Sequence, residues 1–240
     1  MSKNKLMNNA EIELVIAQML DRYFKEKNNG KIMSSVDIDD FVLNFLECQI
    51  IYESIACSSN TLGYVSDGFT KLKVFRKGRI REVLFPKDTI VLDKYLCSRN
   101  SETKRRFVLG HEAGHVITNR LYHQEKAYFN RDFDNLELNN SREMLDLFNI
   151  YEMQANRISA CILIPKLTLM KHLENAFKSK KVIKYDNGTI SRYDRVMLQQ
   201  IADEMKVSFS ALMARLNELD LFEIRPLPYP FNGDEVIVYE

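Results

Sequence analysis

Residues 111–115 read His-Glu-Ala-Gly-His, inside a stretch whose apolar spacing predicts a helix from about Ser101 to Tyr122. Positions four apart lie on the same face of a helix, so His111 and His115 can direct ring nitrogens to one point. Glu112 is turned by about 100° from His111 and can face that point from the side. The alternative is a helix with two incidental histidines packed on a core.

This set of residue types is typical of a metal site. Zinc binds two imidazoles and a carboxylate and leaves a fourth position to water. Because a bound metal lowers the pKa of water, Glu112 would be the general base that takes its proton during attack on a carbonyl. We therefore predict a Zn²⁺ site on His111 and His115. Gly114 costs about 1 kcal/mol relative to Ala in mid-helix, which indicates that a strand or helix packs closely there.

The third ligand must come from another segment. Leu121 stands where one class of such sites has a third His. Glu152 is the candidate, because it lies on a helix predicted over residues 141–164 and the small Ala155 permits close helix approach. Asn156 follows one turn later and can orient a ligand from behind. Spacing alone leaves a solvent-facing polar stripe as the alternative for Glu152.

Sequence periodicity predicts strands in the first half of the chain and helices in the second. The predicted helices cover 9–27, a segment after Ser35, 101–122, 141–164, 167–178, 194–205 and 209–219. The predicted strands are 50–52, 72–75, 79–85 and 89–92, with one hairpin at Lys77-Gly78 and another at Asn187-Gly188. A polar loop is expected over 123–140. Strands followed by helices favour an α+β fold.

Charge and hydropathy restrict the partners. The formal net charge is +1, without the basic surplus of most nucleic-acid binders, although a basic patch can hide in a balanced total. The first residues are polar and no run of about 20 apolar residues occurs, so we expect neither signal peptide nor membrane span, and a cytoplasmic location. Four cysteines are then expected to be reduced and buried: Cys48, Cys57, Cys97 and Cys161.

Three motifs occur in a fixed order. Residues 106–115 match R-F-x-x-x-H-E-x-x-H, residues 152–156 approach E-x-E-A-N, and residues 162–165 approach L-L-M-P. Together they resemble the ImmA/IrrE family of zinc metallopeptidases over roughly residues 36–222. Gln154 and Ile164 depart from the family pattern. Weaker similarity is found at Tyr52-Glu53, Leu62-Gly63-Tyr64, Ile201-Ala202, Val207-Ser208 and Arg215-Leu216.

The resemblance implies a zincin-like core at 35–190, with a small mixed or antiparallel sheet, the His-Glu-x-x-His helix and the Glu-bearing helix. An N-terminal helix at 1–34 would precede it, and a helix-turn-helix-like helical subdomain with an extended tail at 191–240 would follow. It makes Glu152 the third zinc ligand. It also implies cytoplasmic regulated proteolysis, with an XRE-type helix-turn-helix repressor of a mobile element or stress regulon as the protein substrate.

Two other functions stay open, a DNA-binding regulator that uses residues 194–222 and a zinc-binding interaction module without turnover. Residues 210–219 carry only Arg215 against Glu218, few groups for reading bases, so direct DNA binding is not expected. Glu112 argues against a module without turnover, which needs no base. The group that stabilises the oxyanion is undetermined among Tyr64, Tyr122, His123, Arg192 and Tyr193.

Overall fold

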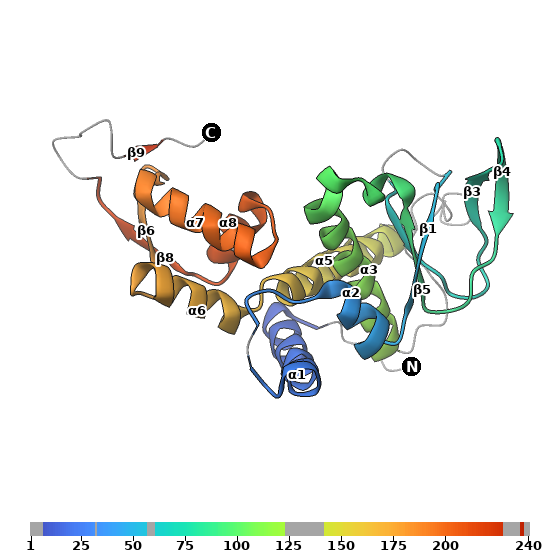
Figure 1. Ribbon diagram of the computed structural model, residues 1–240, viewed down its shortest axis with the longest axis horizontal. Coiled ribbons are helices and arrows are strands. Elements are labelled where there is room, and N and C mark those ends of the chain that lie inside the picture. Colours follow the sequence, from blue (N-terminus) through green and yellow to red (C-terminus); the bar gives the residue numbers. More distant parts are fainter. Residues whose placement is uncertain (1–6, 32, 57–60, 123–141, 228–235, 238–240) are drawn as a thin grey trace. The chain divides into compact units, whose positions relative to one another are not determined.

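The computed structural model describes residues 7–31, 33–56, 61–122, 142–227 and 236–237 (Figure 1). Their helices and small sheets form the mixed α+β fold that the sequence predicts. Two compact units are present, one of Met1–Gly30 with Asp37–Ile162 and one of Lys31–Val36 with Leu163–Glu240. The predicted domain boundaries stay a prediction.

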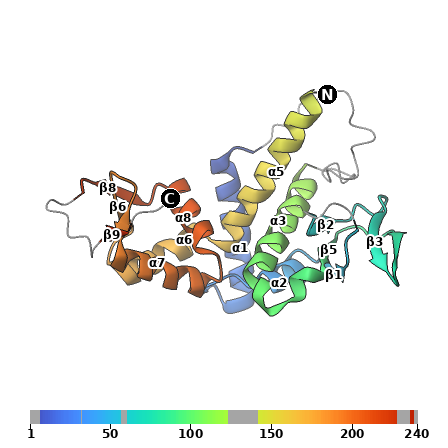
Figure 2. The same cartoon turned by 90° about the horizontal axis from the view of Figure 1, so that it is seen from above.

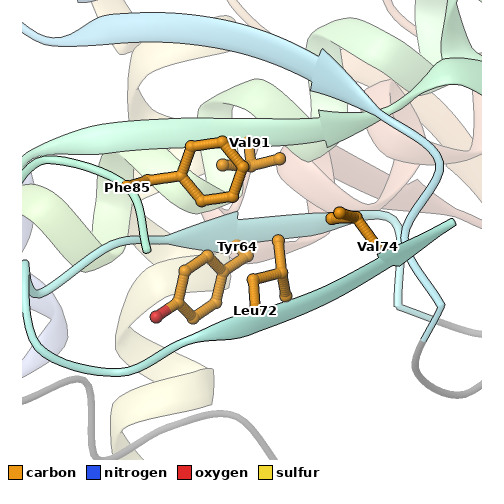
Figure 3. Close-up of a cluster of buried hydrophobic side chains, with 5 residues drawn as sticks. All are labelled: Tyr64, Leu72, Val74, Phe85 and Val91. Carbon is orange, nitrogen blue, oxygen red and sulfur yellow. The ribbon is translucent and has the colours of Figure 1, made fainter. Parts of the chain in front are cut away.

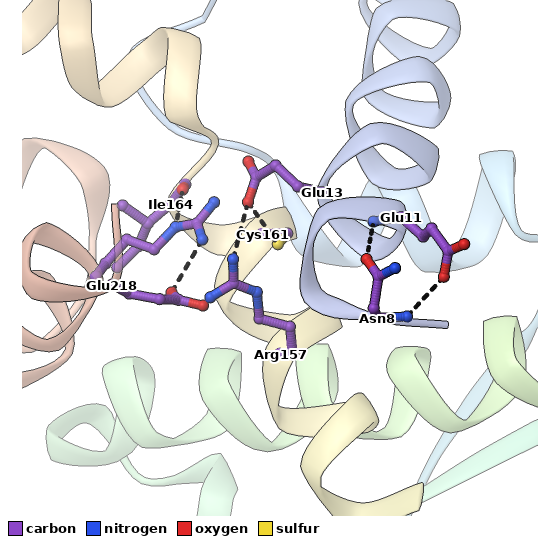
Figure 4. Close-up of polar contacts among 8 residues, drawn as sticks. Asn8, Glu11, Glu13, Arg157, Cys161, Ile164 and Glu218 are labelled. Atoms are coloured by element: carbon purple, nitrogen blue, oxygen red, sulfur yellow. Dashed lines mark hydrogen bonds and ion pairs between the residues drawn. The ribbon is translucent and has the colours of Figure 1, made fainter. Parts of the chain in front are cut away.

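The first unit begins with α1 (Asn9–Asn28), which ends one residue beyond the predicted helix. Its start is a capping box: the Asn8 side chain accepts from the Glu11 amide at 2.9 Å, and the Glu11 carboxylate accepts from the Asn8 amide at 2.7 Å (Figure 4). The helix buries one apolar face and ends at Asn29, in the left-handed region at φ 50°.

A polar contact ties α1 to α5 (Arg142–Leu163). The carboxylate of Glu13 accepts from Nη2 of Arg157 at 3.4 Å and from Sγ of Cys161 at 3.3 Å (Figure 4). Seen from above, α1 lies beside α5 (Figure 2). The N-terminal helix is therefore part of the unit that contains α5.

A three-stranded sheet lies against α3 (Glu102–Leu121) and has the order β1-β5-β2. β1 (Gln49–Glu53) and β5 (Thr89–Asp93) run parallel, while β2 (Gly63–Val65) pairs antiparallel to β5 and forms an edge. β2 is absent from the strands predicted from periodicity. The chain leaves β1, forms β2 and then a hairpin, and returns to β5 in the direction of β1, so the sheet is mixed.

The hairpin consists of β3 (Leu72–Arg76) and β4 (Arg79–Val83), as predicted. Lys77 and Gly78 both have positive φ, 52° and 74°, as a two-residue turn of this kind requires. The base of the hairpin packs on the sheet through a buried apolar cluster (Figure 3). The cluster consists of Tyr64, Leu72, Val74, Phe85 and Val91.

Short elements connect the sheet to the helices. The helix predicted after Ser35 is α2 (Ile38–Asp40), which continues as a π-helical turn at Phe41–Phe45. Arg105 near the start of α3 donates to both carboxylate oxygens of Asp39, at 2.6 and 2.7 Å. This bidentate pair fixes the first turn of α3 to α2. Two 3-10 turns, Lys94–Cys97 and Arg99–Ser101, precede α3.

The two long helices approach each other closely at Gly114 of α3. A Cβ atom at this position would lie 2.7 Å from the carbonyl oxygen and 2.9 Å from Cα of Ala155 on α5. Both are backbone atoms and cannot move aside without moving the helix. The close packing predicted from a mid-helix glycine and a small Ala155 is therefore confirmed.

Replacing Gly114 with Ala is expected to destabilise the protein. The new methyl group would lie under 3 Å from backbone atoms of Ala155, and forcing the helices apart should cost more, within a range of roughly 1–3 kcal/mol, than the gain of about 1 kcal/mol in helix propensity. Urea unfolding should show a lower midpoint. Thr103→Ala, at an exposed position of the same helix, should change stability by less than about 0.5 kcal/mol. An unchanged midpoint for Gly114→Ala would show that the helices have room.

The second unit contains α6 (Lys166–Phe177), followed by α7 (Arg192–Met205) and α8 (Phe209–Glu218). Its strands are β6 (Val182–Tyr185), β7 (Ile190–Ser191), β8 (Phe222–Arg225) and β9 (Val236–Ile237). β6 pairs parallel with β8, and β7 pairs antiparallel with β9.

The hairpin predicted at Asn187-Gly188 is right in its turn and wrong in its strands. The Gly188 amide donates to the Tyr185 carbonyl at 2.9 Å, which closes the turn. The flanking strands nevertheless pair with other partners. Ser191 caps α7, accepting from the Asp194 amide at 3.0 Å, so the strand that follows the turn ends after two residues.

The α7–α8 pair leaves no exposed arginine on α8. Arg215 is 1% exposed, donates through Nε to the Ile164 carbonyl at 3.1 Å and pairs with Glu218 at 2.9 Å (Figure 4). Arg215 therefore stabilises the second unit and is not available to a base edge. The description of this pair as helix-turn-helix-like stays a prediction.

The remaining sequence-based expectations concern the loop and tail, the cysteines and a membrane span. The loop at 123–140, with His123, as well as Cys57 and the tail residues Pro228 and Pro230, lie outside the described residues. Cys48 and Cys161 are buried as expected, whereas Cys97 is exposed, so that expectation is wrong for Cys97. Among the helices that the structure describes, none is both long and apolar enough to cross a membrane.

Candidate metal centre and active site

The structure brings together the three residues that the sequence predicts as ligands. His111 and His115 project from α3 and Glu152 from α5, and their ligand atoms all lie within 4.8 Å of one another. The two Nε2 atoms are 3.0 Å apart. One oxygen of Glu152 lies 3.3 Å from Nε2 of His111, and the other lies 3.3 Å from Nε2 of His115.

Asn156 fixes the tautomer of His111. Its carboxamide oxygen lies 2.9 Å from Nδ1 of His111, and because this oxygen can only accept, Nδ1 carries the proton. A neutral His111 then has its lone pair on Nε2, which faces His115 and Glu152. This is the arrangement by which a neighbouring polar group orients a metal-binding imidazole.

The charges of the three side chains are coupled. Burial would lower the pKa of His111, but the Glu152 carboxylate beside it raises this pKa to about 9. Burial would likewise raise the pKa of Glu152, but the two imidazoles hold it at about 2. Two imidazole nitrogens and a carboxylate therefore converge where a positive charge is needed to hold them together. This donor set fits a divalent cation that takes nitrogen and oxygen ligands, such as zinc.

Glu112 is on α3, next to His111 in the sequence, and its side chain is only 7% exposed. Burial raises the pKa of its carboxyl group, while the neighbouring histidines act in the opposite direction. A carboxyl group with a raised pKa accepts a proton at higher pH than an exposed one does. A buried carboxyl group thus lies next to the candidate metal site, where it can accept a proton.

Gly63 of the edge strand β2 forms the wall against which Glu112 packs. A Cβ atom at this position would lie 2.7 Å from Cγ and 2.8 Å from Cδ of Glu112. Sequence reasoning did not identify Gly63 as part of the site. A glycine inside a strand often marks a close approach, but β2 is too short to show the alternation that would identify it as a strand.

Replacing Gly63 with Ala is expected to displace the Glu112 side chain. A catalytic group moved by about 1 Å can cost roughly 100-fold in rate, so hydrolysis should fall by about that factor. Metal content, measured by mass spectrometry after desalting, should stay unchanged because the three atoms nearest to a Cβ at Gly63 all belong to Glu112. Full activity in this variant would show that hydrolysis does not depend on the observed position of the Glu112 side chain.

The candidates for an oxyanion-stabilising group are only partly supported by their positions. Tyr64 follows Gly63 and points to the opposite face of β2, where its hydroxyl donates to the Thr70 carbonyl at 3.2 Å. The hydroxyl of Tyr122 accepts from the Met7 amide at 2.6 Å. Arg192 and Tyr193 belong to α7 of the second unit. The oxyanion-stabilising group therefore stays undetermined.

Comparison with known proteins assigns the class. The model of the Peptidase_M78 family, described as an IrrE N-terminal-like domain, matches residues 95–217, just over half of the 240 residues. The chain therefore belongs to this family of metal-dependent peptidases, and the ImmA/IrrE resemblance inferred from the motifs is confirmed. The match includes the predicted ligands on α3 and α5.

More distant similarity adds little. A search among curated proteins gives no match. Among solved structures, a Mycobacterium tuberculosis transcriptional regulator is similar with a TM-score of 0.47 and 11% sequence identity. The similarity covers 92% of this chain and 48% of that chain. This chain therefore spans about half the length of that protein.

Proposed function

We propose that the protein is a zinc-dependent endopeptidase. His111, His115 and Glu152 hold Zn²⁺, and Glu112 is the general base. The observation that carries the proposal is the convergence of two Nε2 atoms and a carboxylate within 4.8 Å, with a buried carboxyl group of raised pKa beside them. Family membership supports the peptidase class.

The proposed reaction divides the work among the side chains. When bound, zinc polarises the carbonyl of the peptide bond and lowers the pKa of water. Glu112 takes a proton from the attacking water and then delivers it to the departing amine, because a carboxylate accepts a proton and the resulting carboxylic acid can donate it again. Asn156 keeps the imidazole of His111 in one tautomer and orientation through its 2.9 Å hydrogen bond.

The edge strand beside Glu112 supports an extended polypeptide as the substrate. Leu62 accepts from the Asp93 amide at 2.9 Å, and the Ser66 amide donates to Thr89 at 2.9 Å. In an antiparallel ladder the bonding residues alternate, so the backbone groups of Gly63 and Val65 point toward the side of β2 on which the described part of the chain places no further strand. A peptide can add to such an edge as a further strand.

The finer identity of the substrate rests on the ImmA/IrrE resemblance. It supports an XRE-type helix-turn-helix repressor as the protein that is cut, with relief of repression of a mobile element or stress regulon as the result. Such a repressor acts in the cytoplasm, which supports a cytoplasmic location for its peptidase. The same resemblance supports a zincin-like core at 35–190 and a helix-turn-helix-like part at 191–240.

Incubation of the zinc-loaded protein with XRE-type repressors encoded beside its own gene tests this function. We expect one or a few defined fragments, identified by mass spectrometry, and no fragments after a chelator removes the metal. Repressors that bind the zinc-loaded protein but stay intact would instead support an interaction module without turnover. Cleavage that continues in the chelator would contradict a metallopeptidase.

A further inference from the structure

The β3–β4 hairpin concentrates positive charge. Residues 71–81 contain six basic side chains and no acidic one, and the single acidic residue of the two strands, Glu82, lies opposite Lys73. The chain has 34 basic and 33 acidic residues in all, so the residues outside this segment carry 28 basic (34 less six) against 33 acidic side chains. The near-neutral total thus conceals one strongly basic element in an otherwise acidic chain.

The basic side chains near the turn are accessible. Residues 79–82 of β4 are exposed on both faces of the ribbon, and Lys77 at the turn is exposed as well. Arg76 forms a salt bridge with Glu53. By contrast, no salt bridge within the described parts of the chain involves Lys77, Arg79 or Arg81. Their charges are available to a partner.

One face of the hairpin also presents apolar side chains. Phe75 and Ile80 are directly opposed across the two strands and are 51% and 62% exposed. The opposite face carries Leu72 and Val74, which are fully buried against the sheet. Phe75 and Ile80 therefore do not contribute to the core.

We infer that the β3–β4 hairpin docks in the major groove of double-stranded DNA. A two-stranded ribbon fits this groove, which is about 12 Å wide. Arg79 and Arg81 lie on the face opposite Phe75 and Ile80, so they would point toward the mouth of the groove, where they and Lys77 at the turn can reach the flanking phosphates. Phe75 and Ile80 would face the bases, where apolar groups contact thymine methyls.

The order of residues favours DNA over a bilayer. The tip of the hairpin is Arg76-Lys77-Gly78-Arg79, without an apolar side chain, and the Phe75–Ile80 pair lies behind it. Insertion into a membrane would require the apolar side chains at the tip, with the cations behind. In this hairpin the charged side chains lie at the tip, where they can contact a phosphate backbone.

The position of the hairpin keeps this surface separate from the candidate active site. In both views the hairpin lies on the side of the β1-β5-β2 sheet opposite α3 (Figures 1 and 2). Tyr64 and Val91 pack toward the hairpin, whereas Gly63 faces Glu112 on α3. DNA on the hairpin would therefore not cover the candidate active site, and neither activity depends on the other.

Titration of a fluorescent duplex of about 30 base pairs with the full-length protein, between about 50 and 200 mM salt, tests the inference. The wild type should bind with a steep salt dependence. Combined Lys77→Gln, Arg79→Gln and Arg81→Gln should reduce the slope of log K against log salt by about 2 to 3, at about 0.9 per phosphate contact. Affinity at the lowest salt should fall by roughly tenfold or more.

A matched control removes three exposed lysines elsewhere, Lys166→Gln, Lys171→Gln and Lys180→Gln, and should bind as the wild type does. Phe75→Ser with Ile80→Ser should weaken duplex binding and leave the salt slope unchanged. Equal effects of the two triple variants would overturn the inference. So would a wild type that fails to bind the duplex, or that prefers single strands or vesicles with about 30% phosphatidylserine. Unchanged metal content in every variant confirms that the fold persists.

Discussion

Replacing Glu112 with Gln is expected to lower peptide-bond hydrolysis by about 10²–10⁴-fold, the range that a positioned general base contributes. Gln has nearly the same size and can fill the space beside Gly63, but it cannot accept a proton. Metal should remain bound, because Glu112 is not among the three side chains that converge. The rate of fragment formation under single-turnover conditions and the metal content of the same sample are the measurements.

Stability separates this effect from misfolding. Because burial disfavours the Glu112 carboxylate, its neutral amide replacement is not expected to lower the unfolding temperature. Glu102→Gln makes the same chemical change at an exposed position in the first turn of α3 and should retain full activity. If Glu112→Gln cleaves as fast as the wild type, Glu112 is not the base and the proposed mechanism is wrong.

Replacing Glu152 with Ala is expected to abolish stable metal binding. The wild type should hold about one zinc per chain after desalting, and the variant close to none. Loss of a group that only orients a ligand costs 10–100-fold in affinity, so loss of a ligand itself should cost more than about 100-fold. Mass spectrometry of desalted protein measures the metal, and activity should fall in parallel.

Glu174→Ala, which removes an exposed carboxylate from α6, is the control and should keep its metal. A Glu152→Ala protein that retains one zinc would mean that another residue completes the site. A wild type without metal, even after zinc is supplied, would contradict the zinc proposal while leaving the fold intact. The binding-module and regulator functions would then be favoured.

The sequence predicted the candidate ligands because their geometry is local. Four residues along a helix determine the distance between His111 and His115, and a matched motif indicates Glu152. The part played by Gly63 was not predicted, because it depends on tertiary pairing: β2 lies beside α3 only through its ladder with β5. Gly114 was recognised since a glycine in mid-helix is unusual by itself.

The same distinction explains the fold. Helix α1, with its apolar periodicity, and the β3–β4 hairpin, with its turn glycine, were predicted within a few residues. The parallel pairing of β1 with β5 joins segments far apart in sequence, and no local pattern reports it. The Asn187-Gly188 turn was recognised, but its strand partners were not, because β8 and the cap of α7 determine them. The basic hairpin escaped a composition argument because charges elsewhere balance it.

The contact of Glu13 with α5 has a consequence for the evolution of this chain. The family match begins at residue 95, after α1 and after every strand of the β1-β5-β2 sheet. A gene fusion that transferred only the matched segment would separate Arg157 and Cys161 from Glu13, and Glu112 from Gly63. The segment that carries α3 and α5 is therefore not expected to function when it is transferred alone. Recombination breakpoints before α1 should be tolerated, whereas breakpoints between α1 and α3 should be selected against.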